Sequence, residues 1–213
     1  METFLRIAVI TAFFFCVIAL LATVTQTLFF GKKPIYATPR GNSRKGVAYA
    51  FGRGMMPWEK ESARKHLPTY FSGFIYHFGI FAGLFYLFSL VIPFQLGFSF
   101  ILLLKILTAA GLACGLGLLI KRTINEYMRK ISCPDDFFAN GLVDIFLFLS
   151  LMDMLSTDFR SAFYVAAAAL LLYIPVGKVR HCFFFFYCRI LFGRFFGRRG
   201  VYPSSQSQFK GDK

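Results

Sequence analysis

The chain has 213 residues, of which 57% are hydrophobic, and its mean hydropathy is +0.60. It also carries 24 Lys and Arg against 10 Asp and Glu, which gives a formal net charge of +14. A soluble globule of this size exposes a large share of its surface and cannot bury so many apolar side chains. These values exclude an ordinary soluble domain and predict an integral membrane protein whose apolar surface the bilayer covers.

Five apolar stretches have about the length that a helix needs to cross a bilayer. They run over residues 4–30, 70–93, 98–120, 140–155 and 159–186. The sequence therefore predicts an all-α integral membrane protein, a five-helix transmembrane bundle that forms a single domain over 1–203. The first stretch is too long for the apolar core of a signal peptide, so we expect it to remain as a helix. A polar, basic loop is expected at 31–67 and a disordered tail at 204–213.

Basic residues are concentrated in three segments: the loop at 31–67, the turn after the third helix, and the region that follows the fifth helix. Lys and Arg in short loops stay on the cytoplasmic side of a membrane. Five helices put all three segments on one side, so we expect an outside N terminus and a cytoplasmic C terminus. The predicted location is the cytoplasmic (inner) membrane of a prokaryote, with several passes. The loop at 31–67 is expected to meet an acidic protein surface or anionic lipids.

One basic segment is superficially similar to an RNA-binding sequence. The run from Arg194 to Gly200 reads RFFGRRG, like the arginine-glycine segments that bind RNA. The phenylalanines at 183–186 and Leu191 indicate instead a helix end in the headgroup layer, with basic side chains that reach toward water. We therefore expect no nucleic acid among the partners.

Two of the three histidines lie in predicted helices, at a similar depth under the same face of the membrane. His77 is about seven residues into the second helix, which at roughly 1.5 Å per residue is about 10 Å below the surface. His181 lies near the end of the fifth helix. Ionisable residues inside a membrane usually mark a site, and two such histidines can ligate one haem iron from its two sides. The alternative is that both are hydrogen-bonded structural residues without a cofactor.

Three basic side chains near the same surface are candidates to bind the haem propionates: Lys178, Arg180 and Arg122. Glycines on the second and third helices would let a flat macrocycle approach the backbone, although small residues equally serve helix packing. These glycines are Gly73, Gly79, Gly83, Gly111, Gly115 and Gly117.

The remaining ionisable residues give weaker signals. His66 precedes the second helix, and we expect it to be a solvated or interfacial loop residue. Lys105, about seven residues into the third helix, either extends toward the outer surface or contacts a quinone carbonyl. Asp144 and Asp153 on the fourth helix are candidates for a proton path, but Asp144 equally fits a pair with a basic residue, and Asp153 is expected near the outer surface.

Three segments are similar to motifs of one family: Phe74–Ile80 (FIYHFGI), Gly117–Arg122 (GLLIKR, followed by Asp135 and Asp136), and Ile174–His181 (IPVGKVRH). From about Tyr70 to Arg199 the chain resembles the nitrate reductase gamma subunit family, the five-helix membrane cytochromes b. Its Phe-rich ending with GRRG most resembles the branch formed by the membrane subunits of heterodisulfide reductase and of sulfite-reduction complexes.

The resemblance implies that His77 and His181 are the axial iron ligands of the haem b nearer the cytoplasm, beside an iron-sulfur partner subunit. It also implies that Lys105 lies near a quinone pocket. Family members with two haems have a further histidine in the second helix and another early in the fifth. The corresponding regions here, 85–88 and 161–164, contain no histidine. We therefore expect one haem b.

The expected function is that of a b-type cytochrome subunit. It would pass electrons between a cytoplasmic iron-sulfur oxidoreductase subunit and a menaquinone-like quinone, which is an exchangeable substrate. No catalytic activity is expected from the chain alone. The alternative is a haem-free structural anchor or assembly subunit of a respiratory complex; a transporter is a third possibility, although the sequence shows no inverted repeat.

Overall fold

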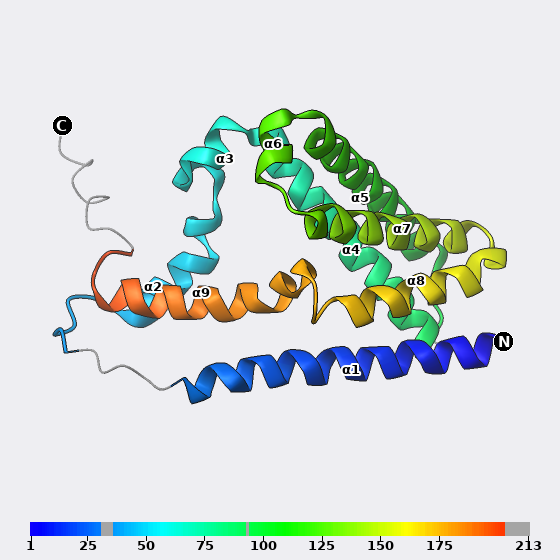
Figure 1. Ribbon diagram of the computed structural model, residues 1–213, viewed down its shortest axis with the longest axis horizontal. Coiled ribbons are helices and arrows are strands. Elements are labelled where there is room, and N and C mark those ends of the chain that lie inside the picture. The colour runs from blue at the N-terminus through cyan, green and yellow to red at the C-terminus, as the bar shows by residue number, and fades with distance from the viewer. Residues whose placement is uncertain (31–35, 93, 203–213) are drawn as a thin grey trace. The chain divides into compact units, whose positions relative to one another are not determined.

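The computed structural model describes residues 1–30, 36–92 and 94–202 (Figure 1). It is 85% helical and has no strand among the described residues, which confirms the all-α class. Three parts of the sequence-based prediction lie outside these residues: position 93 of the second helix, positions 31–35 of the basic loop, and the tail at 204–213.

Where the sequence predicts a single domain, the described residues divide into two compact units. The first unit contains Met1–Thr23 and Pro68–Arg180. The second contains Val24–Leu67 and the residues from His181 onward.

Long helices make up the first unit. They are α1 (Glu2–Phe29, as far as Thr23), α4 (Leu67–Val91, from Pro68), α5 (Phe98–Ile124), α7 (Pro134–Leu155) and α8 (Arg160–Tyr173), with the short α6 (Glu126–Ile131) between α5 and α7. In Figure 1, α7 runs beside both α5 and α8, which agrees with the packing of these helices. Phe146, Leu147 and Phe163 are completely buried at the centre of this unit.

The structure extends the fourth predicted span by six residues at its start. α7 begins at Pro134 rather than at residue 140, with Cys133 as its N-cap. Proline is favoured at the first position of a helix because its missing N–H is not needed there, and the Asp136 carboxylate accepts a 2.9 Å hydrogen bond from the Cys133 N–H. The charged residues at 135 and 136 therefore belong to the first turn of a 22-residue helix.

The predicted fifth helix at 159–186 is not continuous. α8 ends at Tyr173, a 3₁₀ helix covers Lys178–Arg180, and α9 begins at His181. Proline at position 175 lacks an N–H and clashes with the carbonyl four residues earlier. Beyond the proline, the N–H groups of Val176 and Gly177 both bond to the Tyr173 carbonyl, at 3.1 and 2.8 Å, in a turn that ends α8. The apolar run that reads as one span is therefore two helices.

The second unit is built around two helices that lie side by side, α2 (Ser43–Phe51) and α9 (His181–Arg198) (Figure 1). Short turns follow α2: the 3₁₀ helices Arg53–Met55 and Pro57–Glu59, and α3 (Glu61–Lys65). The predicted loop at 31–67 is thus largely helical from Ser43 onward. The Asn42 side chain caps α2 by accepting hydrogen bonds from the N–H groups of Arg44 and Lys45.

Glycines allow α2 and α9 to approach closely. A Cβ atom on Gly46 would lie 2.1 Å from the Gly193 carbonyl oxygen, and one on Gly197 would lie 2.8 Å from the Gly46 Cα. Larger residues at these positions would push the two backbones apart. Aromatic side chains of Tyr49 and Tyr202 stack beside the contact, with ring centroids 5.0 Å apart.

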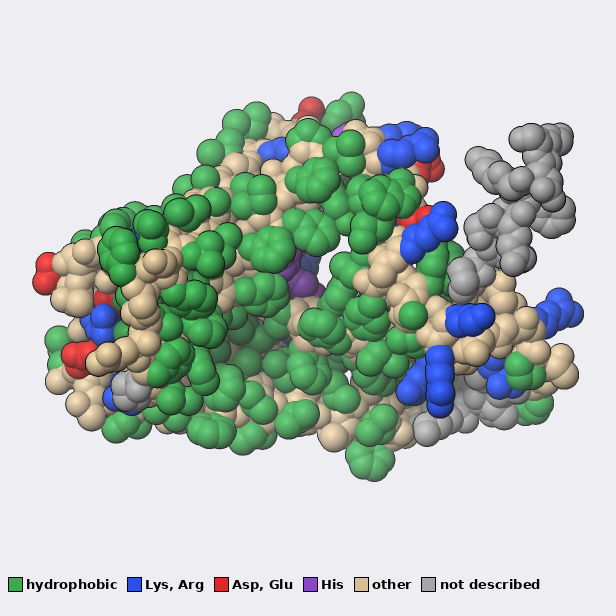
Figure 2. Space-filling model, turned by 180° about the vertical axis from the view of Figure 1, so that it is seen from behind, with side chains coloured by type: hydrophobic (Ala, Val, Ile, Leu, Met, Phe, Trp, Pro, Cys, Tyr) green, Lys and Arg blue, Asp and Glu red, His purple; other side chains and the backbone are tan. Residues whose placement is uncertain are grey.

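Four helices are long and apolar enough to cross a membrane: α1, α4, α5 and α7. A fifth span is present if α8 and α9 together count as one. Large hydrophobic side chains point outward from these helices, and hydrophobic groups cover much of the visible face in Figure 2. An outward apolar surface of this kind needs lipid around it. The chain is therefore a multi-pass membrane protein.

Candidate functional site

His77 lies on a face of α4 that is exposed on the first unit. Helical spacing places large aromatic residues on the same face, one turn away on either side, because residues three and four apart are neighbours on a helix. They are Phe74 and Phe81, which are 39% and 61% exposed, and the adjacent Phe78 is 56% exposed. The imidazole therefore sits in an apolar, aromatic surface that is open to lipid or to another molecule.

The backbone of α4 fixes the tautomer of His77. Its Nδ1 lies 2.6 Å from the Gly73 carbonyl oxygen. A carbonyl can only accept, so Nδ1 carries the proton, and in the neutral ring the lone pair is then on Nε2. Metal-ligating histidines commonly have this arrangement, with the second ring nitrogen bonded to a carbonyl. A Cβ on Gly73 would meet nothing within 4 Å. These features fit a haem ligand at this position.

His181 and Arg180 occupy the boundary between the two units. Arg180 is the last residue of the first unit, and His181 opens α9 in the second. Both side chains are exposed on their own unit, as is His66 at the end of α3. The two predicted iron ligands, His77 and His181, therefore belong to different units. Among the described residues, no three or more His, Cys, Asp or Glu side chains gather as they would around a metal ion.

Two predicted propionate-binding residues converge on one carboxylate. The Lys178 Nζ lies 2.8 Å from Asp136 Oδ1, and the Arg122 guanidinium lies 3.8 Å from Asp136 Oδ2. Arg122 also donates a 2.9 Å hydrogen bond to the Ser132 hydroxyl. Lys178 and Arg122 are brought together, but a carboxylate of the chain itself neutralises part of their charge.

The same corner of the first unit holds the end of α8 in place. The Tyr173 hydroxyl bonds to the Asp135 carboxylate, and the Lys178 N–H donates to the other oxygen of that carboxylate at 3.1 Å. A Cβ on Gly177 would lie 2.0 Å from the Tyr173 ring, so only glycine fits beneath it. The first turn of α7 therefore fixes the segment between α8 and the 3₁₀ helix.

Lys105, the candidate quinone contact, is partly exposed in the first half of α5. Within the described ranges, no hydrogen bond or ion pair joins its ammonium group to another side chain. The structure is thus compatible with both predictions for Lys105, extension toward the surface and contact with a quinone.

A buried polar cluster of the first unit is centred on Asp144. The Asp144 side chain is 4% exposed, and its Oδ2 accepts a 2.8 Å hydrogen bond from the Asn140 amide. That amide also lies 3.2 Å from the Tyr76 hydroxyl and 3.4 Å from the Gly115 carbonyl. The expected pair between Asp144 and a basic residue does not form among the described residues. Its neighbours are an amide, a phenol and a glycine.

A second buried carboxylate, Asp153, forms an ion pair with Arg160. The Arg160 Nε lies 2.9 and 2.8 Å from its two oxygens, and the Tyr86 hydroxyl donates to Oδ2 at 2.8 Å. Asp153 is 2% exposed. The sequence did not predict its pair with Arg160. The seven-residue separation across the turn between α7 and α8 is the one sequence signal for the pair.

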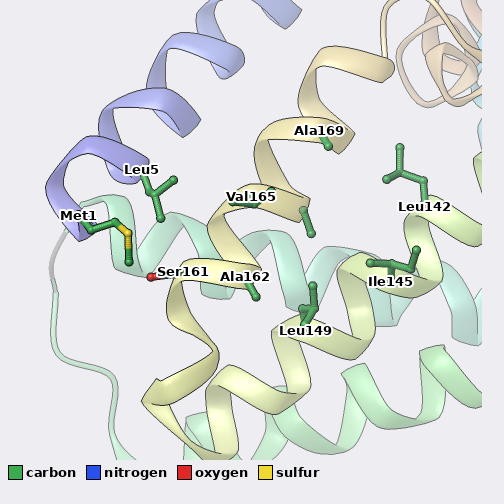
Figure 3. A pocket seen from close by; sticks show the side chains of 10 residues that line it. Met1, Leu5, Leu142, Ile145, Leu149, Ser161, Ala162, Val165 and Ala169 are labelled. Atoms are coloured by element: carbon green, nitrogen blue, oxygen red, sulfur yellow. The ribbon is translucent and has the colours of Figure 1, made fainter.

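An apolar groove lies between α1, α7 and α8 of the first unit, and Figure 3 shows the side chains that line it. Its volume is about 580 Å³. Leu142, Ile145 and Leu149 line one wall from α7, and Ala162 and Val165 line the other from α8. Such a lining suits a hydrocarbon chain. Lys105 is not part of it.

The glycines of α4 and α5 serve mainly to pack helices. Gly79 and Gly111 meet backbone to backbone, since a Cβ on either would lie 2.6 Å from the Cα of the other. Gly83 and Gly115 face buried side chains of α7. Gly73 and Gly117 have open space around them.

Comparison with known proteins gives no relative: no family model, no curated protein and no solved structure matches the chain. The family resemblance therefore rests on the three sequence segments alone.

Proposed function

We propose that the chain is a membrane-bound b-type cytochrome subunit, similar to the five-helix nitrate reductase gamma subunits. It passes electrons between a cytoplasmic iron-sulfur oxidoreductase subunit and a menaquinone-like quinone. The observation that carries the proposal is the hydrogen bond from His77 Nδ1 to the Gly73 carbonyl at 2.6 Å, which leaves the lone pair of the neutral ring on Nε2. One haem b, ligated by His77 and His181, is the proposed cofactor.

A haem with two histidine ligands supplies one-electron transfer, because its iron has no open position for a substrate. The chain's own residues would bind and orient it. The Gly73 carbonyl holds the His77 ring in one orientation, and exposed aromatic side chains lie around it. Arg180, which is exposed, is the predicted propionate contact that remains available to an anion without displacing Asp136 from Lys178 and Arg122.

The proposed orientation has the N terminus outside and the basic segments in the cytoplasm. In this orientation the second unit lies at the cytoplasmic face, where α2 and α9 present basic side chains. Anionic lipids and an acidic face of the iron-sulfur subunit are the partners that this charge favours. The quinone is proposed to exchange with the membrane pool, with Lys105 as its candidate contact.

The test is to replace each histidine with alanine and to quantify haem b in the purified protein. Because each ligand contributes to holding the iron, we expect His77→Ala and His181→Ala to lose the haem. His66→Ala is the matched control and keeps a full complement. Retention of haem in both of the first two variants would overturn the ligand assignment.

The rival function is a haem-free structural anchor, and one observation favours it. Lys178 and Arg122 are engaged with Asp136, as they would be in a protein that binds no propionates. Absorbance distinguishes the two: a cytochrome has a reduced-minus-oxidised difference spectrum with Soret and alpha bands, and an anchor has none.

A further inference from the structure

Asp144 is a carboxyl group inside the membrane-spanning part of the first unit, and it has few partners. One oxygen accepts the hydrogen bond from Asn140, and the other, Oδ1, is fully buried without a hydrogen-bond partner. An ionised carboxylate that is removed from water needs a cation or several donors. Among the described residues the polar side chains that face Asp144 are the Asn140 amide and the Tyr76 phenol, and both are neutral.

Every helix that packs against Asp144 presents a neutral group to it. α4 contributes the Tyr76 hydroxyl, which is the titratable group that faces it, and α5 contributes Gly115. The titratable side chains of α8 interact elsewhere: Arg160 with Asp153, Tyr164 with Arg160, and Tyr173 with Asp135. No basic side chain of the described chain compensates a negative charge at this position.

Asp153 provides an internal comparison on the same helix. It is equally buried, but Arg160 contacts both of its oxygens, and Tyr86 donates a further hydrogen bond. That environment stabilises an ionised carboxylate. The two buried carboxyls of α7 therefore have opposite surroundings, one charged and one neutral.

We propose that Asp144 is a proton-binding site: its carboxyl group carries a proton in the resting protein and exchanges that proton with water at the N-terminal end of α7. Asn140 lies one turn closer to that end and is only partly buried, and its amide contacts both Asp144 and the Tyr76 hydroxyl. Toward the other end of α7, the completely buried side chains of Phe146 and Leu147 block access of water to Asp144. In this proposal the proton is therefore exchanged with one side of the membrane only.

The site needs no haem and stands apart from the proposed electron transfer. Intramembrane carboxyls that take up and release protons are a recurrent feature of proton-handling membrane proteins. Gly115 leaves the space for the carboxyl, since a Cβ there would lie 2.2 Å from Asp144 Oδ1.

Infrared spectroscopy of the full chain in detergent or lipid tests the proton directly. A neutral carboxylic acid has a carbonyl stretch that is separate from the bands of carboxylates. We expect this band at neutral pH, and we expect it to shift in protein made with carboxyl-¹³C aspartate. Absence of a shifting band would overturn the proposal, and this measurement needs no variant to fold.

Two substitutions then assign the band. Asp144→Asn keeps the shape of a neutral carboxyl group and should abolish the band. Asp153→Asn, the matched control, should leave it unchanged. A band that persists in Asp144→Asn, or that disappears in Asp153→Asn alone, would contradict the assignment.

Deuterium exchange tests the route. Transfer of the wild-type protein to D₂O should shift the band, and Asn140→Leu should slow this shift by at least tenfold while the band itself remains. No shift in the wild-type protein would overturn proton exchange. An unchanged rate in Asn140→Leu would overturn the route past Asn140.

Discussion

Glycine 115 shows how one missing side chain permits a buried polar group. A Cβ at this position would lie 2.2 Å from Asp144 Oδ1 and 2.4 Å from the Tyr76 ring, whereas Gly117 on the same helix has open space. Both glycines are weak helix formers. The difference between them is therefore in packing alone, and it can be measured with the same substitution at both positions.

We expect Gly115→Ala to lower the free energy of unfolding by about 1–3 kcal/mol, because the methyl group overpacks a closed site. Gly117→Ala is the control, and it should be neutral or stabilising by up to about 1 kcal/mol, because alanine is the better helix former. Denaturation of the two variants in detergent checks this. Equal losses in both variants would show that the contact with Asp144 has no role.

Asp153 and Arg160 form a buried ion pair. Replacing Arg160 alone should destabilise the protein more than replacing both partners. Arg160→Met leaves a buried carboxylate without its cation, so we expect a loss of about 3–5 kcal/mol in the free energy of unfolding. The double variant Asp153→Leu with Arg160→Met should recover much of that loss. If the double variant is no more stable than Arg160→Met alone, the charge on Asp153 is not the cause.

Among the helices, four predicted spans are present in the structure, and their ends lie within a few residues of the predicted ones. Apolar length identifies α1, α4, α5 and α7, because a bilayer requires about 20 apolar residues whatever their neighbours are. The end of α8 at Tyr173 was not predicted. This end depends on the Tyr173 ring that lies against Gly177 and on the Asp135 carboxylate at the start of α7. Such tertiary contacts leave no periodic pattern in the sequence.

Some contacts of the buried polar groups could be predicted from the sequence, and others could not. Asn140 and Asp144 are four residues apart on one helix, so their contact is predictable from helical spacing. Tyr86 and Asp153 are 67 residues apart, and their hydrogen bond follows from the packing of α4 against α7. The pairing of Lys178 and Arg122 with Asp136 equally requires the fold.

The turns after α2 contain a surface group whose charge depends on pH. The Arg53 guanidinium lies 2.6 Å from Glu59, and the Tyr49 hydroxyl donates to Glu59 at 2.8 Å. The Arg53 hydrogen bond, with that of Tyr49, lowers the pKa of Glu59. Burial and the hydrogen bond to Glu59 raise the pKa of Tyr49 to about 12.

A lowered pKa in the folded state means that the Glu59 charge stabilises the fold above its unfolded pKa of about 4.3. The stabilisation is lost as the pH falls further, through the lowered native pKa. We expect wild type to be more stable than Glu59→Gln at pH 7, and the difference to vanish in acid. Thermal unfolding of both proteins across this pH range is the measurement. A difference that is constant with pH would exclude the Glu59 charge as its source.

At the scale of the whole molecule, the distribution of basic residues predicts the orientation in the membrane. In a background without the five native cysteines, a single cysteine at Tyr127, which is 81% exposed on α6, should react with a membrane-impermeant thiol reagent only from the cytoplasmic side. Gln95→Cys, between α4 and α5, is the opposite control and should react only from outside. The reverse pattern would overturn the predicted topology.

The proposed function requires one haem b in each chain. The most direct measurement is a pyridine haemochrome assay together with a reduced-minus-oxidised spectrum on the purified, folded protein. We expect one haem b per chain, with Soret and alpha difference bands. A folded preparation that was produced with haem available and contains none would contradict it and favour the structural anchor.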